Sequence, residues 1–128
     1  MKLLLDTHVF LWWNEASPRL SPRASELLSD QTNSLFLSVA SAWEIVLKVH
    51  VGKLKLPSTA AAYIPARLAH YGIGAIPVSL AHVLAAEPLP VHHRDPFDRI
   101  LVAQAQVERL AVVTHDPQIL KYDVETVW

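Results

Sequence analysis

Residues Leu110–Asp116 have the sequence LAVVTHD, in which four apolar residues run directly into polar ones. The start of the chain has the same arrangement, because the largely apolar segment Lys2–Leu5 (KLLL) ends at Asp6. Short apolar runs of this kind are typical of strands that are buried on both faces, as in parallel sheets. The two segments therefore predict two core strands, each followed closely by an acidic residue.

Strand and helix patterns alternate along the rest of the chain. Further strands are predicted at Ser34–Leu37, Ile73–Val78 and Val124–Val127. Helices are predicted at Ser21–Ser29, Ser38–Val51, Thr59–Tyr71, Ser79–Ala86 and Asp95–Leu110, with a short turn after Pro117. Residues 87–93 form a predicted loop, because prolines at positions 88 and 90 block a helix and a central strand alike. This alternation predicts an α/β sandwich around a mainly parallel sheet, and the length of 128 residues predicts a single domain, residues 1–128.

The composition narrows the classes of function. Hydrophobic residues make up 52% of the chain and charged residues 18%, as in compact globular domains. The chain has no Cys, which excludes disulfides and thiolate metal sites. Its formal net charge is −1, so contact with a nucleic acid requires a local basic patch.

Asp6 interrupts the first apolar run too early for a signal peptide, and no run approaches the roughly 20 apolar residues of a membrane span. We therefore expect a cytoplasmic protein without membrane contact.

Acidic residues follow both of the predicted core strands. Asp6 and Asp116 lie just past the carboxyl ends of their strands. Open parallel sheets bind ligands beyond those ends, near the point where strand order reverses. Either acid alone is adequately explained as a turn residue or a helix cap. Their equivalent positions on two core strands favour a shared site.

Glu44 belongs to a predicted helix that is apolar on nearly every side. Between residues 39 and 49 the polar positions are Ser41, Glu44 and Lys48, which are spaced three and four apart and form one narrow stripe. Two interpretations stay open from the sequence. The stripe is either a solvent-facing edge with a Glu44–Lys48 ion pair, or a carboxylate and an ammonium that both face a cleft.

Two acids stand at the start of the last predicted helix, in the stretch His93–Ala105 (HRDPFDRILVAQA). Asp95 can serve as N-cap, Pro96 fits the first turn, and Asp98 lies near the positive end of the helix dipole. Capping alone explains this stretch when it is considered in isolation. Considered with the other acids, Asp98 completes a set of four carboxylates: Asp6, Glu44, Asp98 and Asp116.

Such a set is costly through mutual repulsion unless a cation neutralises it. Clustered carboxylate oxygens favour a hard divalent ion, Mg²⁺ or Mn²⁺. The 7 histidines form no helical two-His metal motif, and we expect surface or packing roles for them.

Three blocks of the chain resemble the PIN-domain family, and within it the VapC-type toxins of VapBC toxin–antitoxin pairs. They are LLLDTHVFLWW (3–13), SVASAWEIVLKVHVGKLKLP (38–57) and HRDPFDRILVAQAQVERLAVVTHD (93–116). The resemblance implies a three-layer α/β/α sandwich and a metal-dependent ribonuclease. It also implies that the catalytic metal ligands are Asp6, Glu44, Asp98 and Asp116, with Thr7, Lys48, Arg99 and Thr114 as secondary site residues. Asp95 and Asp98 both fit the third acid, and Asp98 is preferred because it leads directly into the helix.

The leading hypothesis is therefore a Mg²⁺-dependent endoribonuclease, the toxin of a type II pair, with Mn²⁺ as a substitute ion. The metal would activate water against an RNA phosphodiester, and Lys48 or Arg99 would contact phosphate. The resemblance implies a VapB-like antitoxin and a homodimer, and the apolar excess with Trp12 and Trp13 also favours a dimer.

Two other classes of protein agree less well with the sequence. A phosphoacceptor signalling domain needs two acids after the first strand and an Asp after a central one, whereas Ile76–Ser79 has none. A non-catalytic module derived from a PIN domain would be favoured by the loss of an acid, and all four are present.

Overall fold

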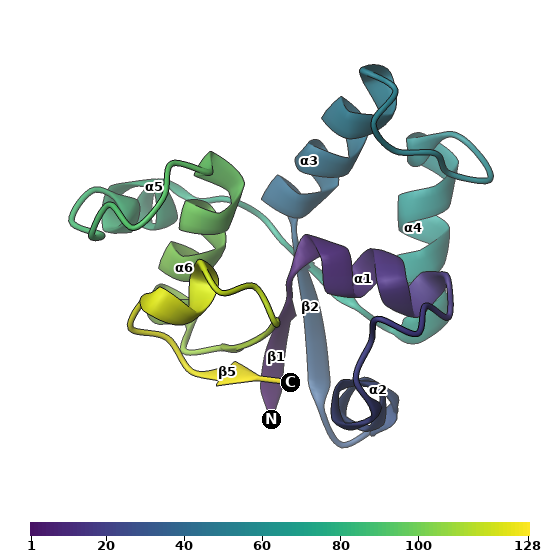
Figure 1. Cartoon of the computed structure of the whole chain (residues 1–128), viewed down its shortest axis with the longest axis horizontal. Helices are drawn as coiled ribbons and strands as arrows, with labels where there is room; N and C mark the ends of the chain where they lie inside the picture. The colour runs from purple at the N-terminus through teal and green to yellow at the C-terminus, as the bar shows by residue number, and fades with distance from the viewer.

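A five-stranded sheet with helices on both faces forms the structure, a computed structural model that describes residues 1–128 (Figure 1). The strands are β1 (Lys2–Leu5), β2 (Ser34–Ser38), β3 (Gly74–Ile76), β4 (Ala111–Val113) and β5 (Thr126–Val127). Their order in the sheet is β3-β2-β1-β4-β5, and every neighbouring pair is parallel. The predicted parallel sheet is thus confirmed, although β3, β4 and β5 are shorter than the apolar runs that predict them.

Helices of the first part of the chain cover one face of the sheet, and later helices cover the other. They are α1 (Thr7–Asn14), α2 (Pro22–Ser29), α3 (Val39–His50), α4 (Ala60–Tyr71), α5 (Leu80–Ala86), α6 (Pro96–Glu108) and a short 3₁₀-helix η1 (Ile119–Lys121). In Figure 1, α1 to α4 lie on one side of β1 and β2, and α5 and α6 lie on the other. None of these helices is long and apolar enough to cross a bilayer.

The alternating side chains of β1 separate two hydrophobic cores. Leu3 and Leu5 point to one face and pack with Phe10 of α1 and residues of α2 to α4. Leu4 points to the other face, where it packs with Leu101 of α6 and neighbouring apolar side chains. All three leucines are fully buried, because both faces of the sheet are covered. The three-layer α/β/α fold is confirmed.

Helix α1 is not predicted by the sequence patterns. Its residues, THVFLWWN, are apolar almost throughout, so they carry no clear periodicity of 3.6 residues. The side chain of Asp6 accepts a hydrogen bond from the His8 N–H at 3.2 Å and caps this helix. The other helices begin and end within one or two residues of the predicted limits. Helix α6 ends at Glu108 because Arg109 adopts the left-handed conformation, with φ of 55°.

The order in which the chain adds strands to the sheet reverses at β1. From β1 the chain moves to β2 and β3 on one side and later to β4 and β5 on the other. Leu5 pairs with Val113, and the Asp6 N–H donates to the Val113 carbonyl at 3.1 Å. Asp6 and the residues after Val113 therefore lie at a topological switch point, where open parallel sheets bind ligands.

Candidate active site

Thr114 connects the two acids that follow β1 and β4. Its Oγ1 donates to Oδ2 of Asp6 at 2.7 Å and accepts the N–H of Asp116 at 3.1 Å. Burial is the main cause that raises the pKa of Asp6 above its ordinary value, since the residue is only 4% exposed. The negative charge of Asp116 raises this pKa further, while hydrogen bonds from Thr114 and His8 lower it. Asp6 and Asp116 thus share one electrostatic environment.

The two acids at the start of α6 have separate roles. Oδ1 of Asp95 accepts the N–H groups of Phe97 at 2.9 Å and of Asp98 at 3.1 Å, so Asp95 is the helix N-cap. The carboxyl group of Asp98 is free of capping. Burial raises the pKa of Asp98 to about 6, and the charges of Asp95, Asp6 and Asp116 add to this effect, against a hydrogen bond from His93 that lowers it. The negative charges of Asp6 and Asp116 therefore act on Asp98.

An open pocket of about 310 Å³ gives access to Asp6 and Asp116. Its lining comprises Asp6, His8, Trp12, Arg19, His115, Asp116 and Pro117. The ring of His115 stacks on that of Trp128 at 5.2 Å. Arg19 is the one Lys or Arg of this lining, and sequence reasoning missed it because it lies in an irregular segment between two helices.

Glu44 is buried, so the solvent-facing interpretation of its stripe is wrong for this residue. Its Oε2 accepts from Nζ of Lys48 at 2.7 Å, and the Lys48 side chain is 37% exposed. One helical turn earlier, Oγ of Ser41 accepts from Oγ1 of Thr7 at 2.8 Å, next to Asp6. The stripe of α3 thus faces the end of β1, where Lys48 neutralises Glu44 while the other three acids repel one another.

Arg99 is already engaged by its own chain. Its terminal nitrogens donate to the carbonyls of Ala86, Leu89 and Pro90 and to the hydroxyl of Tyr122, at 2.9–3.3 Å. These bonds fix the segment between α5 and α6. Among the cations that the site offers, Arg19 and Lys48 are better placed to meet a phosphate.

Two histidines have contacts that the sequence analysis did not foresee. His93 bridges Asp98 and Tyr122, with Nε2 at 3.1 Å from Oδ2 of Asp98 and Nδ1 at 2.9 Å from the tyrosine hydroxyl. No sequence pattern predicts this bridge, because His93 lies in an irregular loop. His82 is buried and completes a capping box with Ser79, and here the Ser-x-x-His spacing was an available signal.

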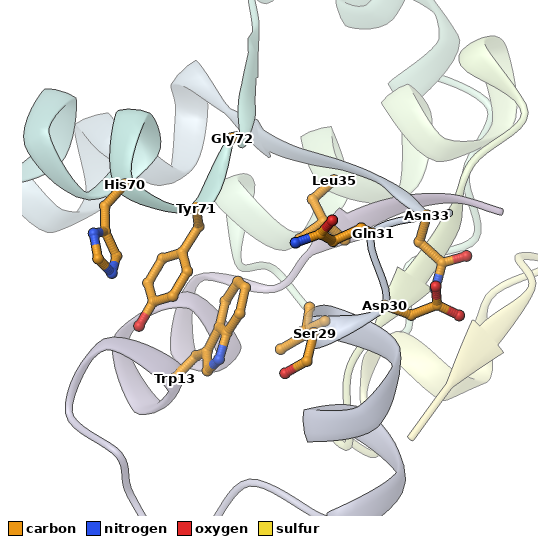
Figure 2. A pocket seen from close by; sticks show the side chains of 10 residues that line it. Trp13, Ser29, Asp30, Gln31, Asn33, Leu35, His70, Tyr71 and Gly72 are labelled. Carbon is orange, nitrogen blue, oxygen red and sulfur yellow. The ribbon is translucent and has the colours of Figure 1, made fainter.

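A different pocket, of about 440 Å³, lies at the amino edge of the sheet. Figure 2 shows Trp13, Tyr71 and the polar residues around them, and the rings of Trp13 and Tyr71 stack at 3.8 Å. Asn33 and Gly72 of its lining precede β2 and β3, whereas the acids follow the carboxyl ends of strands. None of the four predicted acids lines this pocket, so it is separate from the candidate site.

The donor chemistry of the site fits a hard divalent cation. Asp6, Asp98 and Asp116 offer carboxylate oxygens whose mutual repulsion such an ion would relieve. No three acidic or histidine side chains are gathered closely enough to bind an ion by themselves. Mg²⁺ usually keeps several waters and is held through one or two carboxylates, so it does not require a closed protein cage.

Solved structures with the same architecture cover nearly the whole chain. VapBC2 from Rickettsia felis, bound to a DNA fragment from its promoter, matches 99% of this chain and 98% of its own with a TM-score of 0.72 and 17% identity. VapBC-1 from nontypeable Haemophilus influenzae matches 99% of this chain and 97% of its own with a TM-score of 0.67 and 15% identity. At these identities the likeness demonstrates the shared fold.

Sequence comparison identifies the family. The chain is 37% identical over 76 residues to Ribonuclease VapC16 of Mycobacterium tuberculosis (strain ATCC 25618 / H37Rv). That match covers 53% of this chain and 54% of the relative, so it spans about half of each protein. The model of the PIN domain family matches residues 3–125, which include all four predicted acids. This chain belongs to the PIN domain family.

Proposed function

We propose that this protein is a Mg²⁺-dependent endoribonuclease and the toxin of a type II toxin–antitoxin pair. The observation that supports the proposal is electrostatic: the charges of Asp6 and Asp116 raise the pKa of Asp98, and the charge of Asp116 raises the pKa of Asp6. The ribonuclease name of the curated relative supports the activity, and the VapBC structures of similar fold support an antitoxin partner.

Different residues of the site would bind the metal and contact the phosphate during hydrolysis. A bound Mg²⁺ would supply a water of lowered pKa and would neutralise charge that builds up on the phosphate. Asp6, Asp98 and Asp116 would hold the ion, and Thr114 keeps Asp6 in place. Lys48, fixed by Glu44, and Arg19 in the pocket would contact the phosphates of the RNA.

The antitoxin would bind to the same acids. A pocket that contains unneutralised carboxylates attracts a guanidinium group, which can pair bidentately with a carboxylate. A basic segment of a small antitoxin, inserted at Asp6 and Asp116, would then exclude both the metal and the RNA. This attraction should weaken as the salt concentration rises.

The variant Asp6→Asn tests these assignments. Single-stranded RNA should be cleaved with Mg²⁺ or Mn²⁺, and the variant should lose at least about 100-fold in rate because a charged ligand is gone. Its metal-free form should melt no lower than wild type, since one charge leaves a repulsive cluster. An arginine-rich peptide should bind more weakly to the variant at low salt.

Asp123→Asn, at an exposed acid outside the site, is the matched control and should change none of these properties. Full activity in excess chelator would contradict the metal mechanism. A collapse of the melting temperature in Asp6→Asn would instead assign a structural role to Asp6.

A further inference from the structure

We propose that His93 is a positioning residue of the active site. It is the third member of a hydrogen-bond chain that runs in one direction from Arg99 through Tyr122 and His93 to Oδ2 of Asp98. The chain fixes the orientation of the Asp98 carboxylate before a cation binds. This inference rests on the proposed function, because it gives a reason for the geometry of one proposed metal ligand.

The direction of the chain follows from the donors that each group owns. Nη1 of Arg99 lies 3.3 Å from the hydroxyl of Tyr122 and has no acceptor capacity, so the hydroxyl oxygen accepts there. The hydroxyl proton is then directed to Nδ1 of His93, at 2.9 Å. With Nδ1 as acceptor, the neutral imidazole carries its proton on Nε2 and donates to Oδ2 of Asp98, at 3.1 Å.

Packing holds the members of the chain in place. The side chains of His93 and Asp98 are 15% and 13% exposed, and Tyr122 is buried. Little water can therefore replace the hydrogen bonds between them. Arg99 is itself anchored by carbonyls of Ala86, Leu89 and Pro90, and the ring of His92 packs edge-on against that of Tyr122 at 4.8 Å.

The arrangement matches the one around Asp6. In each acid a side chain holds Oδ2: Thr114 for Asp6 and His93 for Asp98. Oδ1 of Asp6 also accepts the N–H of His8, whereas His93 holds Asp98 through Oδ2. A carboxylate held through one oxygen presents the other in a fixed direction. Removal of a partner of this kind typically weakens metal affinity by about 10- to 100-fold.

Four variants of the full chain test the inference through Mn²⁺ affinity, measured by electron paramagnetic resonance of the free ion. His93→Leu removes the donor and should raise the dissociation constant by about 10- to 100-fold. His93→Gln can place an amide N–H near the position of Nε2 and should restore affinity to within a few-fold of wild type. Tyr122→Phe keeps the ring and should give a smaller loss. His70→Leu, which alters an exposed imidazole on α4 outside the chain, should bind Mn²⁺ like wild type.

A second measurement does not depend on metal or on RNA. Long-range ¹H–¹⁵N spectra of wild type at mildly alkaline pH should show His93 with its proton on Nε2. A proton on Nδ1, or a His93→Leu variant with unchanged Mn²⁺ affinity, would overturn the inference. If His93→Leu does not fold, His93→Gln, Tyr122→Phe and the spectra still decide it. Wild type that binds Mn²⁺ but leaves RNA intact would count against the proposed function alone.

Discussion

At the scale of single residues, the acids of this chain differ by their partners rather than by their type. The side chain of Asp95 caps α6, and Lys48 neutralises the negative charge of Glu44. Asp98 lies three residues after Asp95 but is pushed toward its protonated form by burial and by other carboxylates. The sequence predicts Asp95 as the N-cap and favours Asp98 as the site residue, and the hydrogen bonds of Asp95 confirm the cap.

The raised pKa of Asp98 predicts a dependence of stability on pH. The pKa is about 6 in the fold against an ordinary value of 3.8, so this group stabilises the fold fully below about pH 4 and loses that contribution as the pH rises through 6. Asp98→Asn should therefore stabilise the metal-free protein above pH 7 by about 1 kcal/mol, a figure reduced for partial solvent exposure. Urea unfolding in a chelator at pH 4 and pH 7.5 measures the difference.

The same protonation should oppose metal binding, so Mn²⁺ affinity of the wild type should fall as the pH drops below about 6. At pH 4 the variant and the wild type should be nearly equal in stability. A difference between them that is the same at both pH values would mean that ionisation of Asp98 is not its cause.

At the scale of helices and strands, local signals predicted most of the fold. Each helix from α2 to α6 is capped by the side chain directly before it, which is Ser21, Ser38, Thr59, Ser79 and Asp95 in turn. Strands β1 and β4 were marked by apolar runs, and the acids after them identified the functional edge of the sheet. The sequence patterns do not predict helix α1, because its apolar run Val9–Trp13 fits a buried strand as well as a helix. The contacts of His93 depend on the fold, since they join a loop to Tyr122, directly after η1, and to Asp98 of α6.

The end of α6 offers a test of backbone strain. Arg109 has φ of 55°, a left-handed conformation that costs a non-glycine residue about 1 kcal/mol. Arg109→Gly should therefore stabilise the protein by about 0.5–1 kcal/mol, because glycine relieves the strain at this helix C-cap. Arg109→Ala removes the same exposed side chain but keeps Cβ, and it should give no such gain. Thermal unfolding of the three proteins measures both effects, and equal stabilisation by Gly and Ala would refute the explanation.

At the scale of the whole molecule, the exposed apolar surface lies elsewhere than the sequence indicated. Trp13 stacks on Tyr71, and Trp12 packs edge-on against Trp128, so both tryptophans have partners within the chain. Trp43 of α3 is instead 55% exposed. An apolar pocket of about 460 Å³ lies beside it, lined by Val39, Ala40, Trp43, Val78, Pro96, Phe97 and Ile100. Exposed patches of this kind usually mark contact surfaces, and we propose this one as the face of the homodimer.

Trp43→Glu tests that face. In a symmetric dimer the same patch occurs on both sides of the interface, so each substitution introduces two charges into a region of apolar contact. Because Trp43 already lies more than half in solvent, the variant should fold and melt like wild type. Light scattering at micromolar concentration should then find wild type as a dimer and the variant as a monomer. Leu120→Glu, at another half-exposed apolar residue on η1, is the matched control and should stay dimeric.

The patch includes Phe97, directly before Asp98, so dimerisation here would place two acidic sites along one surface for RNA. A wild-type monomer, or loss of the dimer in Leu120→Glu alone, would move the interface away from α3.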